Sequence, residues 1–260
     1  MATITQRSSK AGASRRSWNA HRLYTKLALV LTLVCAWSGL AAVSDAAASP
    51  STHISATQEL TGLLYEHRAY QSPRTSAPLL VSLPAHTPIT GEQTTLPVIG
   101  QANGRGGTRW LRVMLPGRPN GSTGWIARGG TRQLSTSWHI VVNTSQRRVW
   151  VYLHGHVVRT FPVVVGAPST PTPTGDFFVE ESVIMPASEP GGPFALALSA
   201  RSDVFREFDG GPGQIGIHGR DGLGGTLGTA ASHGCFRLAT PDIDWLAARI
   251  GPGVPVNIDG

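Results

Sequence analysis

Cys235 is the residue of this sequence best suited to nucleophilic chemistry. It lies in the stretch ASHGCFRL, residues 231–238, directly after a His-Gly pair, and His218 precedes it by 17 residues. The thiolate is the reactive form of cysteine, and free cysteine has a pKa of about 8.5, so at neutral pH a base must remove the proton. An imidazole suits this role because its pKa of about 6.5 is close to neutral pH. The pattern therefore predicts a cysteine nucleophile that is activated by a histidine.

Two histidines compete for the role of base. The stretch QIGIHG predicts a strand that presents His218 at its end, and the glycine-rich stretch RDGLGGTLGTAA that follows can fold back tightly. We therefore expect His218 and Cys235 to meet at one end of a sheet. His233 lies two residues before Cys235, so in an extended chain the two side chains point the same way, side by side. This favours His218 as the general base and His233 as a positioning or polar lining residue.

The glycine before the nucleophile also has a predicted role. Gly234 lets the backbone N–H groups of Gly234 and Cys235 point toward a developing oxyanion. Two other interpretations of Cys235 stay open at this point. A buried cysteine can act as a small apolar residue. A zinc site of His218, His233 and Cys235 would have only three ligands, whereas structural zinc takes four, so we expect neither a metal nor another cofactor.

The segment 137–260 must position these residues, and its pattern predicts mainly β structure. Strand alternation runs through WHIVVNTSQRRVWVYLHGHVVRTFPVVVG, with a tight turn at His154-Gly155, and TPTGDFFVE, FALALS and VPVNI each predict another strand. The one convincing helix is TPDIDWLAARIGPG. We expect Thr240 as its N-cap, Pro241 in its first position and Gly251-Pro252 as its stop.

The segment 59–134 is expected to be a separate small β-barrel. Short apolar runs alternate with turns in APLLVSL, TTLPVIG, RWLRVML and TGWIAR, and Asn120-Gly121 is a hairpin signal. The pairing of WLRV with GWI across this loop resembles bacterial SH3-like domains. Trp110 and Trp125 are expected in the barrel core, and a pair that stacks on sugars is the alternative.

Residues 1–48 predict an export signal. Six basic residues and no acid lie within residues 1–26, before the apolar run LALVLTLVCAWSGLAAV at 27–43, and small residues follow. This order is typical of a secretory signal peptide, and an uncleaved membrane anchor is the alternative. Residues 49–58 are typical of a flexible linker. We therefore expect an exported protein of the cell envelope.

Removal of the signal changes the charge and the cysteine count. The chain has 22 basic and 15 acidic residues, net +7, but residues 49–260 hold 16 basic and 14 acidic residues, net +2. No basic patch interleaved with aromatics follows, so we expect no nucleic-acid partner. Cys35 is lost with the signal, which leaves Cys235 alone. A single cysteine in an exported protein indicates an intermolecular disulfide or a reactive thiol.

Two motifs at a defined spacing carry a family resemblance. The sequences IHG at 217–219 and SHGCFRL at 232–238, with 13 residues from Gly219 to Ala231, resemble the signature of the YkuD-type L,D-transpeptidases. The resemblance extends over most of 137–260, through IVVNTSQRRVWVYLHG, TPTG at Thr172–Gly175 and GPGVPVNI. It implies a β-sandwich catalytic domain with one packed helix.

The resemblance also implies a reaction on peptidoglycan. In this family the thiolate attacks the peptide carbonyl before a terminal D-alanine of a tetrapeptide stem, and D-alanine leaves. An amine of a neighbouring stem, usually from diaminopimelate, then resolves the thioester into a 3→3 cross-link. The expected partners are therefore the donor and acceptor stem peptides. We expect the chain to act as a monomer.

The family motif assigns a role to each matching residue. Cys235 becomes the nucleophile and His218 the general base, with the Gly219 backbone carbonyl orienting the imidazole. Further residues would line the site, supply oxyanion contacts or hold substrate: Ser232, His233, Gly234 and Arg237. Arg237 would hold a stem carboxylate by a two-pronged contact, and a surface position before the helix is the alternative. Phe236 is expected to pack inward.

Three other functions remain as alternatives. Water could resolve the thioester, which would make the protein an L,D-carboxypeptidase. A degenerate second segment would leave a non-catalytic wall-binding protein with 59–134 as the binder. An ordinary cysteine peptidase usually places its cysteine before its histidine, opposite to the order here. We also expect the isolated segment 137–260 to fold and react.

Overall fold

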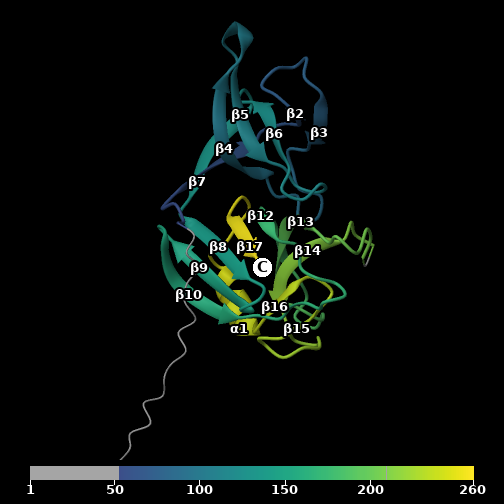
Figure 1. Ribbon diagram of the computed structural model, residues 1–260. Coiled ribbons are helices and arrows are strands. Elements are labelled where there is room, and N and C mark those ends of the chain that lie inside the picture. The colour runs from purple at the N-terminus through teal and green to yellow at the C-terminus, as the bar shows by residue number, and fades with distance from the viewer. Residues whose placement is uncertain (1–52, 209) are drawn as a thin grey trace, which may run out of the picture. The chain divides into compact units, whose positions relative to one another are not determined.

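The first part of the chain forms an open seven-stranded antiparallel sheet (Figure 1). The computed structural model describes residues 53–208 and 210–260, so the predicted signal peptide lies outside the described residues. The sheet has the order β3-β2-β6-β5-β4-β1-β7. Its strands are β1 (Gln58–Leu63), β2 (His67–Tyr70), β3 (Leu79–Leu83), β4 (Thr95–Asn103), β5 (Arg109–Met114), β6 (Thr123–Ala127) and β7 (Thr131–Thr136), with a short 3-10 turn η1 (Arg105–Gly107) before β5.

The barrel predicted for 59–134 is only partly realised. The β5–β6 hairpin forms across the expected loop, with Arg112 opposite Trp125. Trp110 is buried against Tyr70 at 5.9 Å, which confirms its core position, and Trp125 is half-buried. Hydrogen bonding does not close the barrel in the described residues, because β3 and β7 end the strand order without pairing. The resemblance of this region to SH3-like domains stays a prediction.

The second part of the chain forms one continuous eight-stranded sheet in the order β10-β9-β8-β17-β12-β13-β14-β16. Its strands are β8 (Trp138–Asn143), β9 (Arg148–Leu153), β10 (His156–Pro162), β12 (Gly175–Ile184), β13 (Phe194–Arg201), β14 (Gln214–Gly219), β16 (Phe236–Leu238) and β17 (Pro255–Asp259). A small parallel pair, β11 (Val165–Gly166) with β15 (Ala230–Ser232), accompanies it. The mainly β prediction is therefore confirmed.

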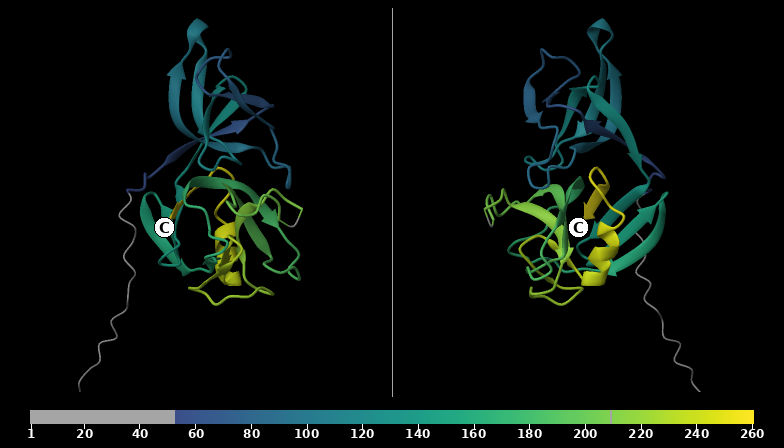
Figure 2. Two further views of the ribbon diagram at one scale, coloured as in Figure 1. Left: turned by 45° about the vertical axis from the view of Figure 1, so that its right-hand side comes forward. Right: turned by 180° about the vertical axis from the view of Figure 1, so that it is seen from behind.

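In place of two separate sheets, the predicted sandwich is a single sheet whose two halves are joined by β12. The first half of β12 pairs with β17, and the second half pairs with β13 after an irregularity between Val179 and Glu181. Side chains of both halves join one core, for example Val149 and Val151 with Leu196 and Leu198. Figure 2 shows the helix α1, in yellow, between the strands of the two halves. This core supports the edge strands that carry the candidate site.

Local sequence explains the hairpin between β9 and β10. His154 and Gly155 both have positive φ, 52° and 77°, as a two-residue hairpin turn requires. The predicted turn is confirmed. In β9, Val149 and Val151 face the main core, whereas Trp150 and Tyr152 face the other side.

The helix α1 (Thr240–Ala247) begins and ends earlier than the sequence predicted. Its N-cap is Ala239, which has no side chain to cap with, and Pro241 is in the second position. Thr240 is not the cap because its hydroxyl donates to the Asp221 carboxylate. The helix ends at Ala247, before the predicted Gly251-Pro252 stop, and buries Ile243 and Leu246 against β13 and β14.

The predicted linker 49–58 is ordered where the structure describes it. Ile54 is 6% exposed and packs with Val141, Trp150 and Tyr152 on the outer face of β8 and β9. Gln58 already begins β1. A single isoleucine in a polar run gives no periodic signal, which explains why the sequence indicated a flexible segment.

Two residues of β12 tie the two sheets together. Phe178 is 1% exposed and belongs to the core of the first sheet, although its strand belongs to the second. The buried Glu181 carboxylate accepts hydrogen bonds from Ile89 N at 3.1 Å, Thr90 N at 2.8 Å and Thr90 Oγ1 at 3.0 Å. The two regions therefore share buried contacts, which the sequence did not indicate.

We predict that Phe178→Ala lowers the free energy of unfolding by about 3–5 kcal/mol, because it leaves a cavity in a packed core. Urea denaturation followed by fluorescence measures this loss. Ile184→Ala is the matched control, since Ile184 is 80% exposed at the end of the same strand, and its effect should stay within about 0.5 kcal/mol. A loss below about 1 kcal/mol for Phe178→Ala would contradict the shared core.

Candidate active site

His218 and Cys235 lie on one face of two neighbouring parallel strands. In the β14–β16 pair, Ile217 is opposite Phe236 and His218 is opposite Arg237. Because side chains alternate between faces, Cys235, one residue before Phe236, shares the face of His218. Cys235 Sγ accepts a hydrogen bond from Gly216 N at 3.4 Å and lies 3.9 Å from the Gln214 carbonyl oxygen. Cys235 directly precedes β16, and the register therefore places the thiol and the imidazole on the same face.

The Gly219 carbonyl fixes the tautomer of His218. Nδ1 of His218 lies 2.7 Å from this oxygen, which can only accept, so Nδ1 carries the proton and Nε2 keeps a free lone pair. This is the contact that the sequence led us to expect from Gly219. Gly191 closes the other side of the ring, since a Cβ on Gly191 would lie 2.7 Å from Nδ1 and its φ is +89°. The imidazole is held in one orientation, ready to accept a proton.

Burial keeps both groups neutral at pH 7. It lowers the pKa of His218 below its ordinary 6.5; the hydrogen bond to Gly219 opposes this and the nearby Arg237 charge adds to it. Burial also raises the pKa of the Cys235 thiol, against smaller lowering effects of the Gly216 N–H and Arg237. The resting state is therefore a thiol beside a neutral base, and proton transfer must accompany nucleophilic attack.

Ser232 shapes the turn that carries the nucleophile. Its buried hydroxyl donates to the Cys235 carbonyl at 2.6 Å and accepts from Gly234 N at 3.1 Å. Thr172 supports the turn from outside, donating to the Gly234 carbonyl at 2.8 Å and accepting from Gly166 N at 3.0 Å. Gly234 has φ +120°, which a residue with a Cβ rarely adopts.

This turn corrects one prediction about the oxyanion. The N–H of Gly234 was expected to face a developing oxyanion, but it is engaged by Ser232 Oγ. Of the two N–H groups that the sequence analysis gave this role, only that of Cys235 stays a prediction, and Ser232 contacts the turn itself. The presence of a serine two residues before the glycine is the sequence signal that could have indicated this turn.

Arg237 is buried beside His218, opposite it in the strand pair. It is 9% exposed, which excludes the surface alternative, and Nη1 donates to the Gly224 carbonyl at 2.6 Å in the glycine-rich loop. Its Nε has no hydrogen-bond partner among the described residues. Arg237 thus holds the return loop near His218, and its contact with a substrate carboxylate stays a prediction. Phe236 is fully buried, as expected.

His233 is exposed and contacts two phenylalanines. Its ring lies 5.9 Å from Phe205 and 5.5 Å from Phe208, and the two phenylalanine rings are 5.4 Å apart. No hydrogen bond joins His233 to Cys235 in the described part of the chain. The predicted lining role is compatible with this position. The sequence analysis did not anticipate the phenylalanines, because nothing local marks Phe205 or Phe208 as neighbours of the nucleophile.

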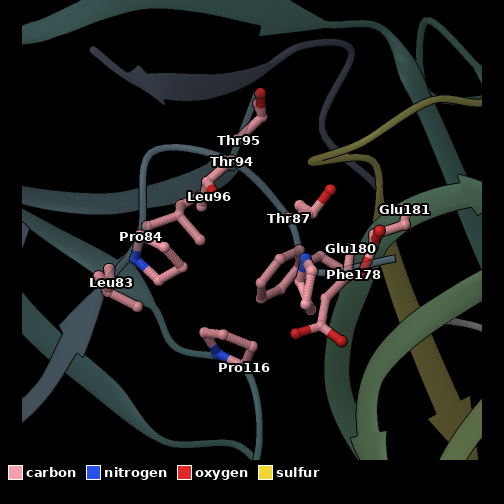
Figure 3. Close-up of a pocket in the computed structure, with 11 residues that line it drawn as sticks. Leu83, Pro84, Thr87, Thr94, Thr95, Leu96, Pro116, Phe178, Glu180 and Glu181 are labelled. Atoms are coloured by element: carbon pink, nitrogen blue, oxygen red, sulfur yellow. The ribbon is translucent and has the colours of Figure 1, made fainter. Parts of the chain in front are cut away.

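A cavity elsewhere is too small to be a peptide site. It encloses about 60 Å³ between the first sheet and β12, and Leu83, Pro84, Phe178 and Glu180 are among its lining residues (Figure 3). That space admits a few water molecules. Within residues 53–208 and 210–260, no group of three His, Cys, Asp or Glu side chains is arranged to hold a metal, and no helix is long and apolar enough to cross a membrane.

Comparison with known proteins shows what this region is similar to. Residues 137–258 match the YkuD family model, the L,D-transpeptidase catalytic domain. The YkuD protein of Bacillus subtilis (strain 168) is 29% identical over 150 residues, which are 56% of this chain and 74% of that protein. L,D-transpeptidase 1 of Mycobacterium tuberculosis (strain H37Rv) is 29% identical over 128 residues, 46% of this chain and 49% of that protein.

Solved structures give a weaker likeness. An L,D-transpeptidase from Mycobacterium smegmatis shares 20% identity with a TM-score of 0.37, over 58% of this chain and 90% of that chain. The residues that match the YkuD family model, 137–258, contain the whole β14–β16 strand pair.

We predict that alkylation of Cys235 by iodoacetamide has a pH midpoint above about 8.5, because burial opposes the thiolate. Cys235 is half-buried, so the small reagent can reach it. The rate is measured from pH 6 to 10 by mass spectrometry of the peptide that contains Cys235. A midpoint near neutral pH would instead indicate a preformed thiolate–imidazolium pair.

Proposed function

We propose that this protein is an exported L,D-transpeptidase that forms 3→3 cross-links in peptidoglycan through a Cys235 thioester. The observation that carries the proposal is the common face of His218 and Cys235, with the imidazole oriented by Gly219. The family match over 137–258 supports the same chemistry. The basic and apolar pattern of residues 1–48 supports export.

The first half-reaction forms the acyl-enzyme. His218 Nε2 takes the proton of the Cys235 thiol as sulfur attacks the carbonyl carbon before the terminal D-alanine. The Cys235 N–H stabilises the oxyanion of the tetrahedral intermediate. The C–N bond then breaks, the protonated imidazole gives its proton to the leaving amine, and D-alanine departs. A thioester and a neutral His218 remain.

The second half-reaction regenerates the thiol. The acceptor amine, which comes from the side chain of a neighbouring stem, attacks the thioester and loses a proton to His218. The C–S bond breaks, and the imidazolium returns the proton to sulfur. Water in place of the amine would give a shortened stem, the L,D-carboxypeptidase outcome, by the same steps.

Recognition of the wall is assigned to two places. His233 and Arg237, with the turn of Ser232 and Gly234, border the thiol and would contact the donor stem. The first sheet, with its predicted SH3-like character, would add affinity for the polymer. Neither role needs a metal or an organic cofactor.

We predict that a carbapenem adds covalently to the protein and that Cys235→Ala abolishes the adduct. His218→Ala should slow adduct formation by about 10²–10⁴-fold at pH 7, because the proton of the neutral thiol then has no base. Electrospray mass spectrometry of intact protein measures both, and circular dichroism shows that the variants are folded. Formation of the adduct at the wild-type rate in His218→Ala would dismiss His218 as the base.

The reaction outcome needs a second measurement. A tetrapeptide donor incubated with and without an amine acceptor should release D-alanine and give a cross-linked product only with the acceptor. A shortened stem as the sole product in both mixtures would replace the transpeptidase with the carboxypeptidase. No adduct and no product from folded protein would favour the non-catalytic alternative.

A further inference from the structure

A loop of residues 202–213, between β13 and β14, borders the nucleophile. It ends at Gln214, whose carbonyl oxygen is 3.9 Å from Cys235 Sγ. The same loop carries Phe205 and Phe208, whose rings contact His233. The position of this loop therefore determines where the two phenylalanine rings lie and where the backbone beside the thiol begins.

Arg118 of the first sheet holds this loop. Arg118 lies in the turn between β5 and β6, and its guanidinium donates to three loop carbonyls: Ser202 O at 2.7 Å, Phe205 O at 2.8 Å and Pro212 O at 2.8 Å. Hydrogen bonds from a charged donor are stronger than those between neutral groups. One side chain thus joins the beginning, the middle and the end of the loop.

Asn120, two residues after Arg118 in the same turn, adds a second set of hydrogen bonds. Its Nδ2 donates to the Arg201 carbonyl at 2.7 Å, and its Oδ1 accepts from Arg201 N at 2.8 Å. The Gly117 N–H adds a bond to the Ser199 carbonyl at 3.2 Å. The β5–β6 turn therefore docks on the end of β13 as well as on the loop.

The other side-chain bonds of the loop lie at its start, where the Ser202 hydroxyl accepts from Val204 N at 3.2 Å and Phe205 N at 3.0 Å, and Asn120 Nδ2 donates to Asp203 Oδ1 at 3.2 Å. The loop's internal backbone bonds join Ser202 N to the Gly213 carbonyl and pair Phe208 with Gly211. Val204 and Phe208 are each 48% exposed, so apolar burial does not fix the loop. An exposed aromatic surface beside a nucleophile is a surface that substrate can cover.

We propose that Arg118 is a positioning residue that holds Phe205, Phe208 and His233 as an apolar wall beside Cys235, where the wall binds the alkyl side chains of the donor peptide. The proposal rests on the proposed function and deepens it, since it makes the first sheet part of the substrate site. It differs from the expectation that segment 137–260 reacts on its own, which stays a prediction.

The test compares Arg118→Ala with Phe208→Ala and with Arg128→Ala as a matched control. Arg128 is half-buried in the same sheet, and its guanidinium donates only to Gln133 among the described residues. Phe208 is exposed, so its replacement leaves the fold intact. Three readouts are used: hydrogen–deuterium exchange of the peptide that covers 202–213, KM and kcat for the tetrapeptide donor, and the iodoacetamide rate at Cys235.

We expect Arg118→Ala to speed exchange in 202–213 and to raise KM about tenfold or more, as loss of hydrogen bonds from a charged group predicts, with kcat within about twofold. Phe208→Ala should raise KM similarly. Both variants should leave the iodoacetamide rate within about twofold of wild type, because this small reagent reacts with the thiol without binding to the phenylalanines. Arg128→Ala should match wild type in all three.

Two results would overturn the proposal by itself. Unchanged exchange in Arg118→Ala would show that the clamp does not hold the loop, and faster exchange with unchanged KM would show that the wall does not bind substrate. A wild-type protein that leaves the donor intact would instead overturn the proposed function, together with this inference.

Discussion

The parallel pairing of β14 with β16 is the constraint on which the site depends. The register that places His218 opposite Arg237 also places Cys235 on the same face, beside Gly216. A shift of one residue would turn the thiol to the opposite face of the sheet. The surrounding contacts support this register: Ser232 and Thr172 hold the turn before β16, and Gly219 and Gly191 adjoin the imidazole at the end of β14.

The electrostatics of the site follow from this placement. A thiol and an imidazole buried together avoid the cost of two desolvated charges by staying neutral, and the shifts of the two pKa values reflect that balance. The buried Arg237 charge disfavours an imidazolium at rest but stands near the point where negative charge develops. A resting neutral pair limits oxidation of the single described cysteine, because oxidants attack the thiolate.

Sequence reasoning reached the parts of the molecule that local patterns specify. Alternating valines predicted β8–β10, His154-Gly155 predicted the turn, and the spacing of His218 and Cys235 predicted that they lie on neighbouring strands. The sequence-based predictions failed where a residue far away in the chain determines the contact. Thr240 does not cap the helix, because its hydroxyl donates to Asp221, and the Gly234 N–H donates to the Ser232 hydroxyl. The role of Arg118 could not be predicted. Its hydrogen-bond partners among the described residues are backbone carbonyls, and these leave no signature in the sequence.

The glycine-rich connection between β14 and β16 has a consequence for how such a site can diversify. It joins two parallel strands without a helix. Asp221 O accepts a hydrogen bond from Gly191 N at 2.8 Å near its start, Arg237 binds the Gly224 carbonyl in its middle, and Gly228 N donates to Val163 O at 3.2 Å near its end. Lengthening a flexible loop costs only about 0.6 kcal/mol per doubling. Insertions between these anchors could therefore reshape the rim around the sulfur while the strand ladder keeps Cys235 and His218 in register, so this stretch can change in length without disturbing the candidate pair.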